Sequence, residues 1–425
     1  MPRQNRPDQI RVLHLSTTLR GGAGLAAYRL HEALSSARVE SAIWSRSAYQ
    51  EQLNAPGVTL EDIGLRRKAA SACTSLANRS LQRGDFPAFT PLDVPTLSMS
   101  RLRDTNVDII HVHNSYNFVS LRHIFKVTQG RAAVIVTMHD ERWYTGGCHY
   151  SGSCDRYLKD CQSCPQCASG LGQLPLWSQR SMQRVLQGAS VASDRICFVA
   201  PSNWLAERAH KSLTLRNSRV ERIANCISDT FFATPRTATL SDTIRVAWIP
   251  NKGEQFLRGI LAACEGISGL HLEVLVPGPF DYQSVAGNID VTRVDPLESE
   301  FDRARFFGSC HVTLMTTEVD NFPNVALESL SVGTPVIVTR AGGAHEPVEE
   351  TGGGWITERD PTEVVRCLSQ IRDDGHYRDM IDRAREGARQ LYHPTAIARQ
   401  HVSLYESLAA KAVGASDSDN LGGHV

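Results

Sequence analysis

The chain has 425 residues, of which 41% are hydrophobic and 21% charged, and its 45 basic side chains balance 45 acidic ones. These values are ordinary for a folded protein with a large core, and the length favours two domains. A net charge of zero provides no global field that attracts nucleic acid. No apolar stretch of spanning length and no signal-peptide pattern is present, so we expect a cytoplasmic protein without a nucleic acid partner.

The first predicted elements are a strand, a glycine turn and a helix. Ile10–Leu15 is a β-rich apolar run, which is typical of a buried strand in a parallel sheet. Gly21 and Gly22 follow, and apolar residues then recur at helical spacing from Leu25 to Leu34. This order of elements points backbone amides toward an anion such as a phosphate, although a plain tight turn explains the two glycines equally well.

Three more apolar runs, at 108–113, 132–138 and 196–200, predict further strands of the same sheet. His139 comes directly after the second of these runs. Ligands of open α/β sheets bind beyond the carboxyl ends of the strands, so His139 is well placed for chemistry. His111 lies within its strand, and we interpret it as a packed core residue.

A locally basic stretch extends from Arg66 to Arg103 and contains few acidic residues. We favour a solvated helix face as its explanation. The functional alternative is a surface that contacts anionic lipid or a lipid-linked diphosphate, which would place the protein at the periphery of the inner membrane face.

The segment 144–167 is unusually rich in cysteine, with Cys148, Cys154, Cys161, Cys164 and Cys167. Two of them have the C-x-x-C spacing (161 and 164) that lets two thiolates bind one tetrahedral ion, and those at 148 and 154 can supply the other two ligands. The cysteine at 167 could replace any of the four, and His149 is a competing ligand. Four sulfurs leave no open coordination position, so such a zinc ion would be structural. The alternatives are reduced cysteines, or disulfides in an exported protein.

The second half of the chain follows a polar stretch, Thr234–Asp242, which is the best linker candidate. Ile244–Ile249 then predicts the first strand of a second sheet, and the runs 270–276 and 310–315 predict further strands. Lys252 follows the first of these strands, ahead of a helix. A lysine there can pair with a diphosphate, and an ordinary surface lysine in a turn is an equal alternative.

Two carboxylates frame the most informative stretch, Asp320-Asn-Phe-Pro-Asn-Val-Ala-Leu-Glu328. Pro323 fits the first turn of a helix, and Gly333 ends that helix. Asp320 then lies in the loop that enters the helix, with Glu328 about a turn and a half further along. Carboxylates held in this way can accept hydrogen bonds from two parts of one ligand, such as the ribose and the hexose of a sugar nucleotide. An amphipathic helix with a capping Asp and a surface Glu is the alternative.

A second glycine turn follows the next predicted strand, Pro335–Val338. Gly342 and Gly343 offer backbone amides as another phosphate cradle. Glu346 lies just beyond them, where capping of a helix N-terminus is an equally good explanation. Two helices are predicted to fill 361–391.

The run from Asp320 to Glu328, continued to Gly-Thr-Pro335, resembles the signature of glycosyltransferase family 4, in which seven residues separate two acids. The resemblance implies a retaining, nucleotide-sugar-dependent enzyme of the α/β GT-B fold, with two doubly wound Rossmann-like domains facing a central cleft and no catalytic metal. It implies that Glu328 holds the donor ribose, and that Asp320, where Glu is commoner, contacts the transferred sugar together with His139. The family's remaining donor-binding positions fall at Gly21, Gly22, Lys252, Gly342, Gly343 and Glu346.

The His-Asp pair at 139–140, followed by Gly-Gly-Cys-His-Tyr-Ser at 146–151, is similar to a subset of bacterial exopolysaccharide glycosyltransferases. This similarity implies that a sugar is transferred to a glycan or lipid-linked acceptor in cell-surface polysaccharide synthesis. The chain departs from this subset at Glu141 and Arg142, where the subset usually has Met-Trp. It departs from the wider family in lacking the arginine that usually precedes Lys252.

By this resemblance, residues 1–230 form an acceptor-binding domain that contains the Cys-rich segment, and 231–392 form the nucleotide-sugar domain. Residues 393–413 are then a helix that packs back on the first domain, and 414–425 are a disordered tail. Two rival hypotheses are a non-catalytic nucleotide-binding module of the same fold and a nucleotide-sugar epimerase.

Overall fold

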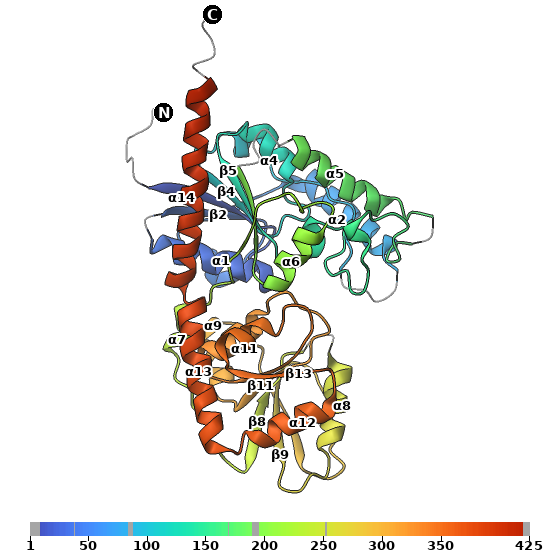
Figure 1. The fold of residues 1–425 in the computed structure, drawn as a ribbon, viewed down its shortest axis with the longest axis vertical. Coiled ribbons are helices and arrows are strands. Elements are labelled where there is room, and N and C mark those ends of the chain that lie inside the picture. The colour runs from blue at the N-terminus through green and yellow to red at the C-terminus, as the bar shows by residue number, and fades with distance from the viewer. Residues whose placement is uncertain are drawn as a thin grey trace, which may run out of the picture. The chain divides into compact units, whose positions relative to one another are not determined.

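The chain forms two compact units, each built around one parallel β-sheet (Figure 1). Unit 1 comprises Met1–Ile223 and Ala398–Val425, and unit 2 comprises Ala224–Ile397. The computed structural model describes residues 9–37, 39–83, 88–168, 170–188, 195–250 and 253–419.

The sheet of unit 1 has seven strands in the order β3-β2-β1-β4-β5-β6-β7, and every neighbouring pair is parallel. The strand order reverses between β1 and β4, which is where ligands of such sheets bind. The strands are β1 (Ile10–Leu15), β2 (Val39–Ser45), β3 (Val58–Leu60), β4 (Ile109–Val112), β5 (Ala133–Thr137), β6 (Ile196–Ala200) and β7 (Val220–Arg222).

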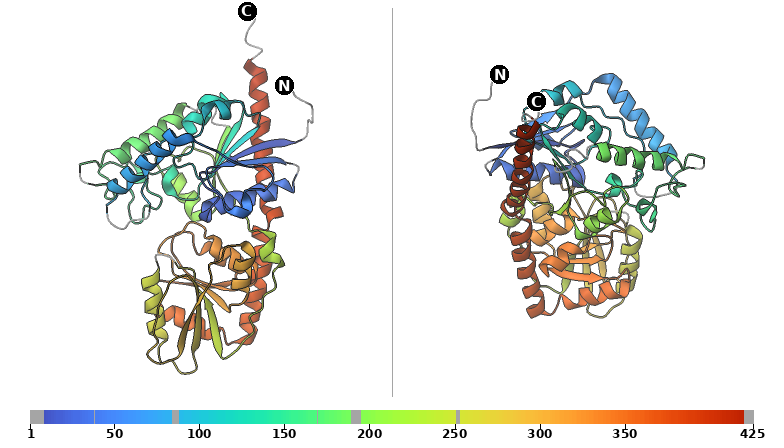
Figure 2. Two further views of the ribbon diagram at one scale, coloured as in Figure 1. Left: turned by 180° about the vertical axis from the view of Figure 1, so that it is seen from behind. Right: turned by 45° about the horizontal axis from the view of Figure 1, so that its top comes forward.

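Helices lie on both faces of this sheet (Figures 1 and 2). They bury continuous apolar runs in the central strands, and every residue of β4, β5 and β6 is buried. The helices of unit 1 are α1 (Gly21–Ser35), α2 (Gly64–Leu81), α3 (Met99–Arg103), α4 (Leu121–Thr128), α5 (Leu174–Gly188) and α6 (Asn203–Lys211).

The sheet of unit 2 has six parallel strands in the order β10-β9-β8-β11-β12-β13, with its reversal between β8 and β11. The strands are β8 (Thr243–Ala247), β9 (His271–Pro277), β10 (Ile289–Val294), β11 (Val312–Met315), β12 (Val336–Thr339) and β13 (Gly354–Thr357). The helices that begin in unit 2 are α7 (Asp229–Ala233), α8 (Glu254–Cys264), α9 (Glu300–Gly308), α10 (Asn324–Ser331), α11 (Glu346–Thr351), α12 (Pro361–Gln370), α13 (Asp374–Tyr392) and α14 (Pro394–Asp419).

The stretch Thr234–Asp242, expected to be the linker, belongs to unit 2, and that prediction is wrong. The backbone amides of Thr237 and Ala238 both donate to the carbonyl of Gly308, at 2.8 and 3.0 Å. The units divide near residue 223 instead. Polar composition alone does not distinguish a linker from a segment that is hydrogen-bonded along the side of a domain.

Helix α14 returns the chain to unit 1. Tyr405 and Leu408 are fully buried there, and the Tyr405 hydroxyl lies 2.8 Å from Nδ1 of His111 on β4. The helix continues to Asp419, into the segment for which a disordered tail was expected, and residues 420–425 lie outside the described part. Among the described residues, no helix is long and apolar enough to cross a membrane.

Candidate functional site

In unit 2, the loops that follow β11 and β12 are joined through their backbones. The amide of Asp320 donates to the carbonyl of Ala341 at 3.2 Å, and the amide of Gly343 donates to the carbonyl of Asp320 at 2.9 Å. Gly342 has a φ of +69°, and a Cβ there would lie 2.4 Å from the Asp320 carbonyl oxygen. A side chain at Gly342 would therefore force the two loops apart.

The Asp320 carboxylate is held at this junction at the carboxyl edge of the sheet. Burial raises its pKa to about 6, against the opposing effect of hydrogen bonds from the backbone amides of Asn321 and Phe322. A carboxylate with so little water around it forms stronger hydrogen bonds to a bound hydroxyl than an exposed one does.

Glu328 lies on α10, and the side chain is only 3% exposed. Pro323 occupies the N-cap of this helix rather than its first turn. Glu328 Oε2 lies 3.5 Å from Nε of Arg303 on α9, and Arg303 is also 3.7 Å from Glu300. The proposed ribose-binding carboxylate therefore has a cationic neighbour that the sequence did not reveal, because the two side chains come from different helices.

The other predicted donor-binding residues of unit 2 that the structure describes lie at the same carboxyl edge of the sheet. The amide of Glu346 donates to the Gly343 carbonyl at 3.1 Å, and Glu346 is a buried residue at the start of α11. Lys252 lies outside the described residues. Its neighbour Gly253 packs so closely that a Cβ would be 1.9 Å from the Thr316 carbonyl oxygen, which holds the loop after β8 against the end of β11.

An arginine lies at the switch point between β8 and β11, although the arginine expected shortly before Lys252 is missing. Arg359, in the loop between β13 and α12, donates through Nη1 to the carbonyls of Thr316 and Thr317, at 3.3 and 3.2 Å. Trp248, which stands in the region where that arginine was expected, is buried and donates to the Thr316 hydroxyl at 2.9 Å. Sequence reasoning missed Arg359 because it lies far from Lys252 along the chain.

In unit 1, the glycine turn after β1 leads directly into α1, which begins at Gly21. Gly21 has a φ of +70° and Gly22 is exposed, and the space beside the Gly21 Cα is open. The tight glycine is Gly24, where a Cβ would lie 2.3 Å from the Thr18 carbonyl oxygen. Gly24 therefore lets the helix pack on the turn, and the two predicted glycines remain at its open end.

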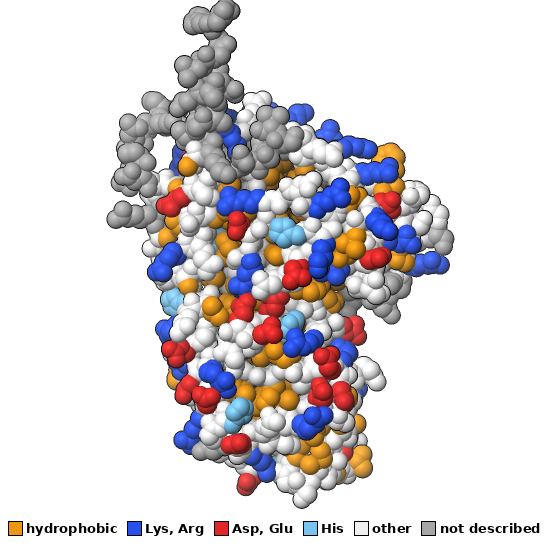
Figure 3. Space-filling view, viewed as in Figure 1, with side chains coloured by type: hydrophobic (Ala, Val, Ile, Leu, Met, Phe, Trp, Pro, Cys, Tyr) orange, Lys and Arg blue, Asp and Glu red, His pale blue; other side chains and the backbone are white. Residues whose placement is uncertain are grey.

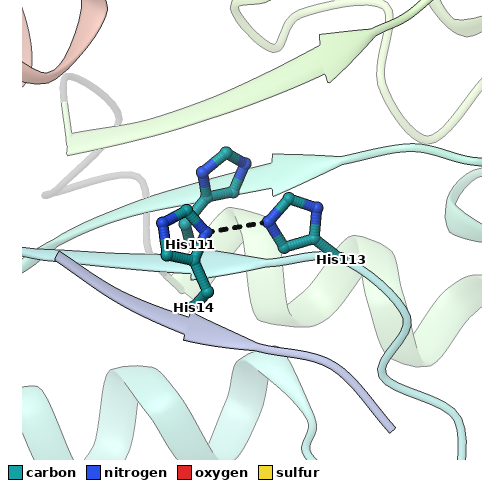
Figure 4. A group of neighbouring side chains, drawn as sticks. All are labelled: His14, His111 and His113. Carbon is teal, nitrogen blue, oxygen red and sulfur yellow. Dashed lines mark hydrogen bonds between the residues drawn. The ribbon is translucent and has the colours of Figure 1, made fainter. Parts of the chain in front are cut away.

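His139, just after β5, is the outer member of a row of imidazoles that continues through His113 to His14. Figure 4 shows the two inner members, His113 and His14, beside His111. His139 Nε2 lies 3.4 Å from Nδ1 of His113, and His113 Nε2 lies 3.0 Å from Nδ1 of His14. Burial lowers the pKa of His139 to about 4 and the pKa values of His14 and His113 well below 6.5. All three imidazoles are therefore neutral near pH 7.

The position of the protons in this row decides what His139 offers to a ligand. His14 Nε2 is buried and has no hydrogen-bond partner among the described residues. If protons point from His14 toward His139, this nitrogen is a bare lone pair; if they point inward, it is an unpartnered N–H, which protein interiors tolerate less well. The first arrangement leaves His139 Nδ1 protonated, as a hydrogen-bond donor.

His14, His111 and His113 have ring nitrogens within 4.8 Å of one another, a separation that a metal ion could bridge. Both nitrogens of His111 are already bonded, one to Tyr405 at 2.8 Å and the other to Thr137 at 2.7 Å. We therefore interpret these histidines as a buried hydrogen-bond network. His111 is a packed core residue, as its position within a strand predicted.

Four cysteines of segment 144–167 line one small cavity of about 10 Å³: Cys148, Cys154, Cys161 and Cys164. A volume of this size accommodates about one water molecule or ion. A hydrogen bond from Cys148, together with backbone amides, lowers the pKa of Cys164 to about 7. Among the described side chains, the three histidines above are the one group of three or more whose ligand atoms all lie within 4.8 Å of one another, so the sulfurs would have to draw together around a metal. Cys167 donates to the carbonyl of Leu171 at 3.4 Å instead, and His149 is paired with Asp140 at 2.6 Å.

Glu141 and Arg142, which stand where the exopolysaccharide subset has Met-Trp, both form ion pairs next to the Cys-rich segment. Glu141 is fully buried and accepts from Arg208 at 2.6 Å and from the Tyr144 hydroxyl at 3.0 Å. Arg142 pairs with Asp93 at 2.8 Å. They are structural ties between the Cys-rich segment and the body of unit 1.

Comparison with known families identifies the chain. Residues 20–231 match the model described as Glycosyltransferase Family 4, and residues 290–387 match the one described as Glycosyl transferases group 1. The chain belongs to glycosyltransferase family 4. Among curated relatives of this family 4 protein is the putative colanic acid biosynthesis glycosyl transferase WcaC of Escherichia coli, 23% identical over 294 residues, which are 65% of this chain and 68% of that protein.

Solved structures show that this family 4 protein has the GT-B fold. Sucrose-phosphate synthase from Thermosynechococcus elongatus matches with a TM-score of 0.60 and 16% identity, over 95% of this chain and all of that one (100%). HepE from Anabaena, solved in complex with UDP and glucose, matches with a TM-score of 0.57 and 15% identity, over 94% of this chain and 100% of that one.

Proposed function

We propose that the protein transfers a hexose, with retention of anomeric configuration, from a nucleoside diphosphate sugar to a glycan or lipid-linked acceptor in cell-surface polysaccharide synthesis. The observation that carries this proposal is the backbone junction that fixes Asp320 beside Gly342 and Gly343 at the carboxyl edge of unit 2. The name of WcaC, which refers to colanic acid biosynthesis, supports the polysaccharide role, and the UDP and glucose bound to HepE support the donor class.

The chemistry requires stabilisation of a leaving diphosphate and of an oxocarbenium-like sugar. In this proposal Glu328 accepts hydrogen bonds from the donor ribose, while Asp320 and His139 contact the transferred sugar. The diphosphate would be held by the glycine turns at Gly21, Gly22 and Gly342, with Lys252 and Glu346 beside them. Gly343 would act by position only, because its amide already donates to the Asp320 carbonyl. We propose neither a covalent intermediate nor a catalytic metal.

Labelled UDP-glucose, with and without a lipid-linked acceptor extract, tests the function against its rivals. Transfer of label to the acceptor supports the proposal. Isomerised sugar nucleotide identifies an epimerase, and binding without turnover identifies a non-catalytic module. Asp320→Asn is the matched control, because a contaminating transferase would be unaffected by it. The anomeric configuration of the product, read by NMR, tests retention separately.

The Cys-rich segment is proposed to hold one structural zinc ion through Cys148, Cys154, Cys161 and Cys164. Their convergence on one cavity and the thiolate character of Cys164 support this. Elemental analysis should give about one zinc per chain. Cys161→Ser should lose the metal and Cys167→Ser should keep it, because Cys167 bonds elsewhere. Absence of metal from fully reduced wild-type protein would refute the site.

Peripheral contact with the inner membrane face is proposed for the basic stretch Arg66–Arg103, which includes most of α2 (Gly64–Leu81). Leu65 and Leu76 on this helix are 84% and 66% exposed, next to exposed cations such as Arg66. Lys and Arg side chains are also spread over the face of unit 1 drawn in Figure 3. Binding to anionic liposomes should weaken as salt rises. Equal binding to neutral liposomes, or no effect of Leu65→Ser, would count against it.

A further inference from the structure

A polar pocket of about 640 Å³ lies in unit 1, beyond the carboxyl ends of four neighbouring strands. Its walls come from the loops after β1, β2, β3 and β4 and from α2. The pocket includes the switch point between β1 and β4, where Thr17 donates to the carbonyls of Asn114 and Tyr116, at 3.0 and 2.9 Å. It therefore occupies the place where open α/β sheets bind their ligands. The other large cavity, of about 540 Å³ between α4 and α5, lies at the amino ends of β5 and β6.

Arg46, in the loop after β2, is the unbalanced charge of this pocket. Its Nη1 donates to the hydroxyl of Ser71 and to the carbonyl of Asn117, both at 3.1 Å. Among the described residues, no carboxylate lies within ion-pair distance of Arg46. Among the described residues its Nε–H and Nη2–H groups have no hydrogen-bond partner, and they reach the surface of the pocket, so they are available to a ligand.

The other charges that line the pocket are paired. Lys68 lies 3.1 Å from Asp62, and Glu61 lies 2.7 Å from Arg101. Each of these charges therefore has a counter-ion, and Arg46 is the charged side chain of the lining for which the described residues supply none. Burial lowers the pKa of Arg46, because the cation has lost part of the water that would otherwise stabilise it.

The guanidinium of Arg46 is held in place by a rigid neighbour. Asn117 has a left-handed backbone, with φ of 53°, and its carbonyl also accepts from the Thr96 hydroxyl at 2.6 Å. Its amide donates to Asp93 at 2.7 Å, and Asp93 in turn pairs with Arg142. These bonds fix the carbonyl that accepts from Arg46, and Asn adopts the left-handed region more readily than most non-glycine residues.

Hydroxyl groups make up much of the remaining wall, which suits a ligand with hydroxyls of its own. They belong to Thr17, Thr18, Ser47, Ser71, Ser75 and Tyr116. The ring of Tyr116 lies under the guanidinium of Arg142, 5.5 Å from its centroid. Arg142 is one of the two residues at which the chain departs from the exopolysaccharide subset, so the departure falls beside this wall.

We propose that this pocket binds the acceptor, and that Arg46 recognises an anionic group on it, either a sugar phosphate or a uronate carboxylate. The proposal rests on the proposed function, since it assigns the acceptor of that transfer. A planar guanidinium with free N–H groups on two nitrogens matches the paired oxygens of either anion. The surrounding hydroxyls would bond the sugar ring.

Ligand-observed NMR titrations of the full chain test this assignment. Glucose 6-phosphate and glucuronate present the two anions, and glucose is the neutral probe. Saturating UDP is present throughout, so that phosphate probes cannot fill the nucleotide site. We expect at least one charged sugar to bind about tenfold more tightly than glucose. Preference for the phosphate assigns a glycosyl phosphate acceptor, and preference for the carboxylate assigns a uronate.

Three variants locate the binding. Arg46→Gln should reduce charged sugars to the affinity of glucose, and Arg46→Lys should retain part of the preference because it keeps the charge without the planar fork. Lys126→Gln, which removes an exposed cation on α4, should change nothing. If Arg46→Gln fails to fold, the wild-type ratio and Arg46→Lys decide. Equal binding of glucose and both charged sugars to the wild type, or a preference that survives Arg46→Gln, overturns the proposal.

The same samples separate this proposal from the proposed function. UDP affinity is measured alone on each variant by calorimetry, and Arg46→Gln should leave it unchanged. Failure of UDP and other nucleotides to bind the wild type refutes the proposed function. The charged-sugar preference is then measured without nucleotide, and its presence or absence still judges the pocket.

Discussion

The two sheets differ in what their central strands bury. In unit 1, β1, β4 and the position directly after β4 carry three buried imidazoles, His14, His111 and His113, at 0–2% exposure. In unit 2, β8 and β11 carry mainly apolar residues, and the buried Thr313 meets a single partner, Ser329, at 2.8 Å. In unit 1 a chain of polar side chains extends from these central positions to His139. The core of unit 1 is therefore connected to its candidate site.

We expect the largest difference between the two units in acid, which should unfold unit 1 before unit 2. The buried histidines have folded pKa values below 6.5, so the unfolded state binds more protons below that pH, and stability falls as pH decreases from about 6.5. Each histidine costs about 1.4 kcal/mol per pH unit over its window. Hydrogen exchange by mass spectrometry, from pH 7 to 4.5, reports each unit separately. Earlier loss of protection in unit 2 would contradict the prediction.

Glu328→Gln should produce the next largest effect, on the donor edge alone. Loss of a charged hydrogen bond to the ribose should weaken free UDP and UDP-sugar alike by about 1.5–3 kcal/mol. Asp320→Asn is the comparison and should leave the affinity for free UDP nearly unchanged. Calorimetry distinguishes them, and a reversed outcome would exchange their roles. Arg303→Gln removes the cation beside Glu328 and keeps the carboxylate. It shows whether loss of this ion pair alone weakens UDP binding.

Asp320→Asn should also change how the protein responds to pH. The folded pKa of Asp320 is about 6 and the unfolded value is 3.8, so the folded state binds more protons between these values. This carboxyl therefore lowers stability as pH rises from about 4 to 6, and the cost persists above that range. The Asn variant should be the more stable protein at pH 7 in urea unfolding, although its turnover is reduced. A variant of lower stability at pH 7 would contradict the desolvation argument.

Tyr405→Phe should have the smallest effect, on unit 1. It removes the hydroxyl partner of His111 Nδ1 and should reduce the free energy of unfolding by about 1–2 kcal/mol. Ser369→Ala, at an exposed hydroxyl on α12, is the control and should be neutral. If both variants have wild-type stability, the bond between Tyr405 and His111 does not contribute to the fold.

Local sequence patterns predicted the central strands of both sheets. Differences in burial explain why certain other strands were not predicted. The runs at Ile10–Leu15 and 196–200 are apolar because neighbours cover both faces, and both form strands. Strands β3, β7 and β10, for which the sequence has no apolar run, all lie at a sheet edge, where their residues are mostly half-exposed or exposed. An edge strand needs no continuous apolar run.

The same distinction applies to the candidate site. The convergence of Cys148, Cys154, Cys161 and Cys164 was predictable because spacing within one segment determines it. The contacts His14–His113 and Arg303–Glu328 were not, because each joins distant elements through the packing of helices or strands. Arg46 gave no signal in the sequence, since its significance comes from the absence of a carboxylate beside it in the folded unit.

The return of α14 to unit 1 affects how the protein is made. Tyr405 and Leu408 belong to the interior of unit 1, yet they leave the ribosome after every residue of unit 2. Domains generally fold in the order of synthesis, but the first one here cannot close its core until the last turns of helix emerge. We expect the nascent chain to expose the histidine-bearing face of its first sheet throughout the translation of the second domain, and to depend on chaperones during that interval.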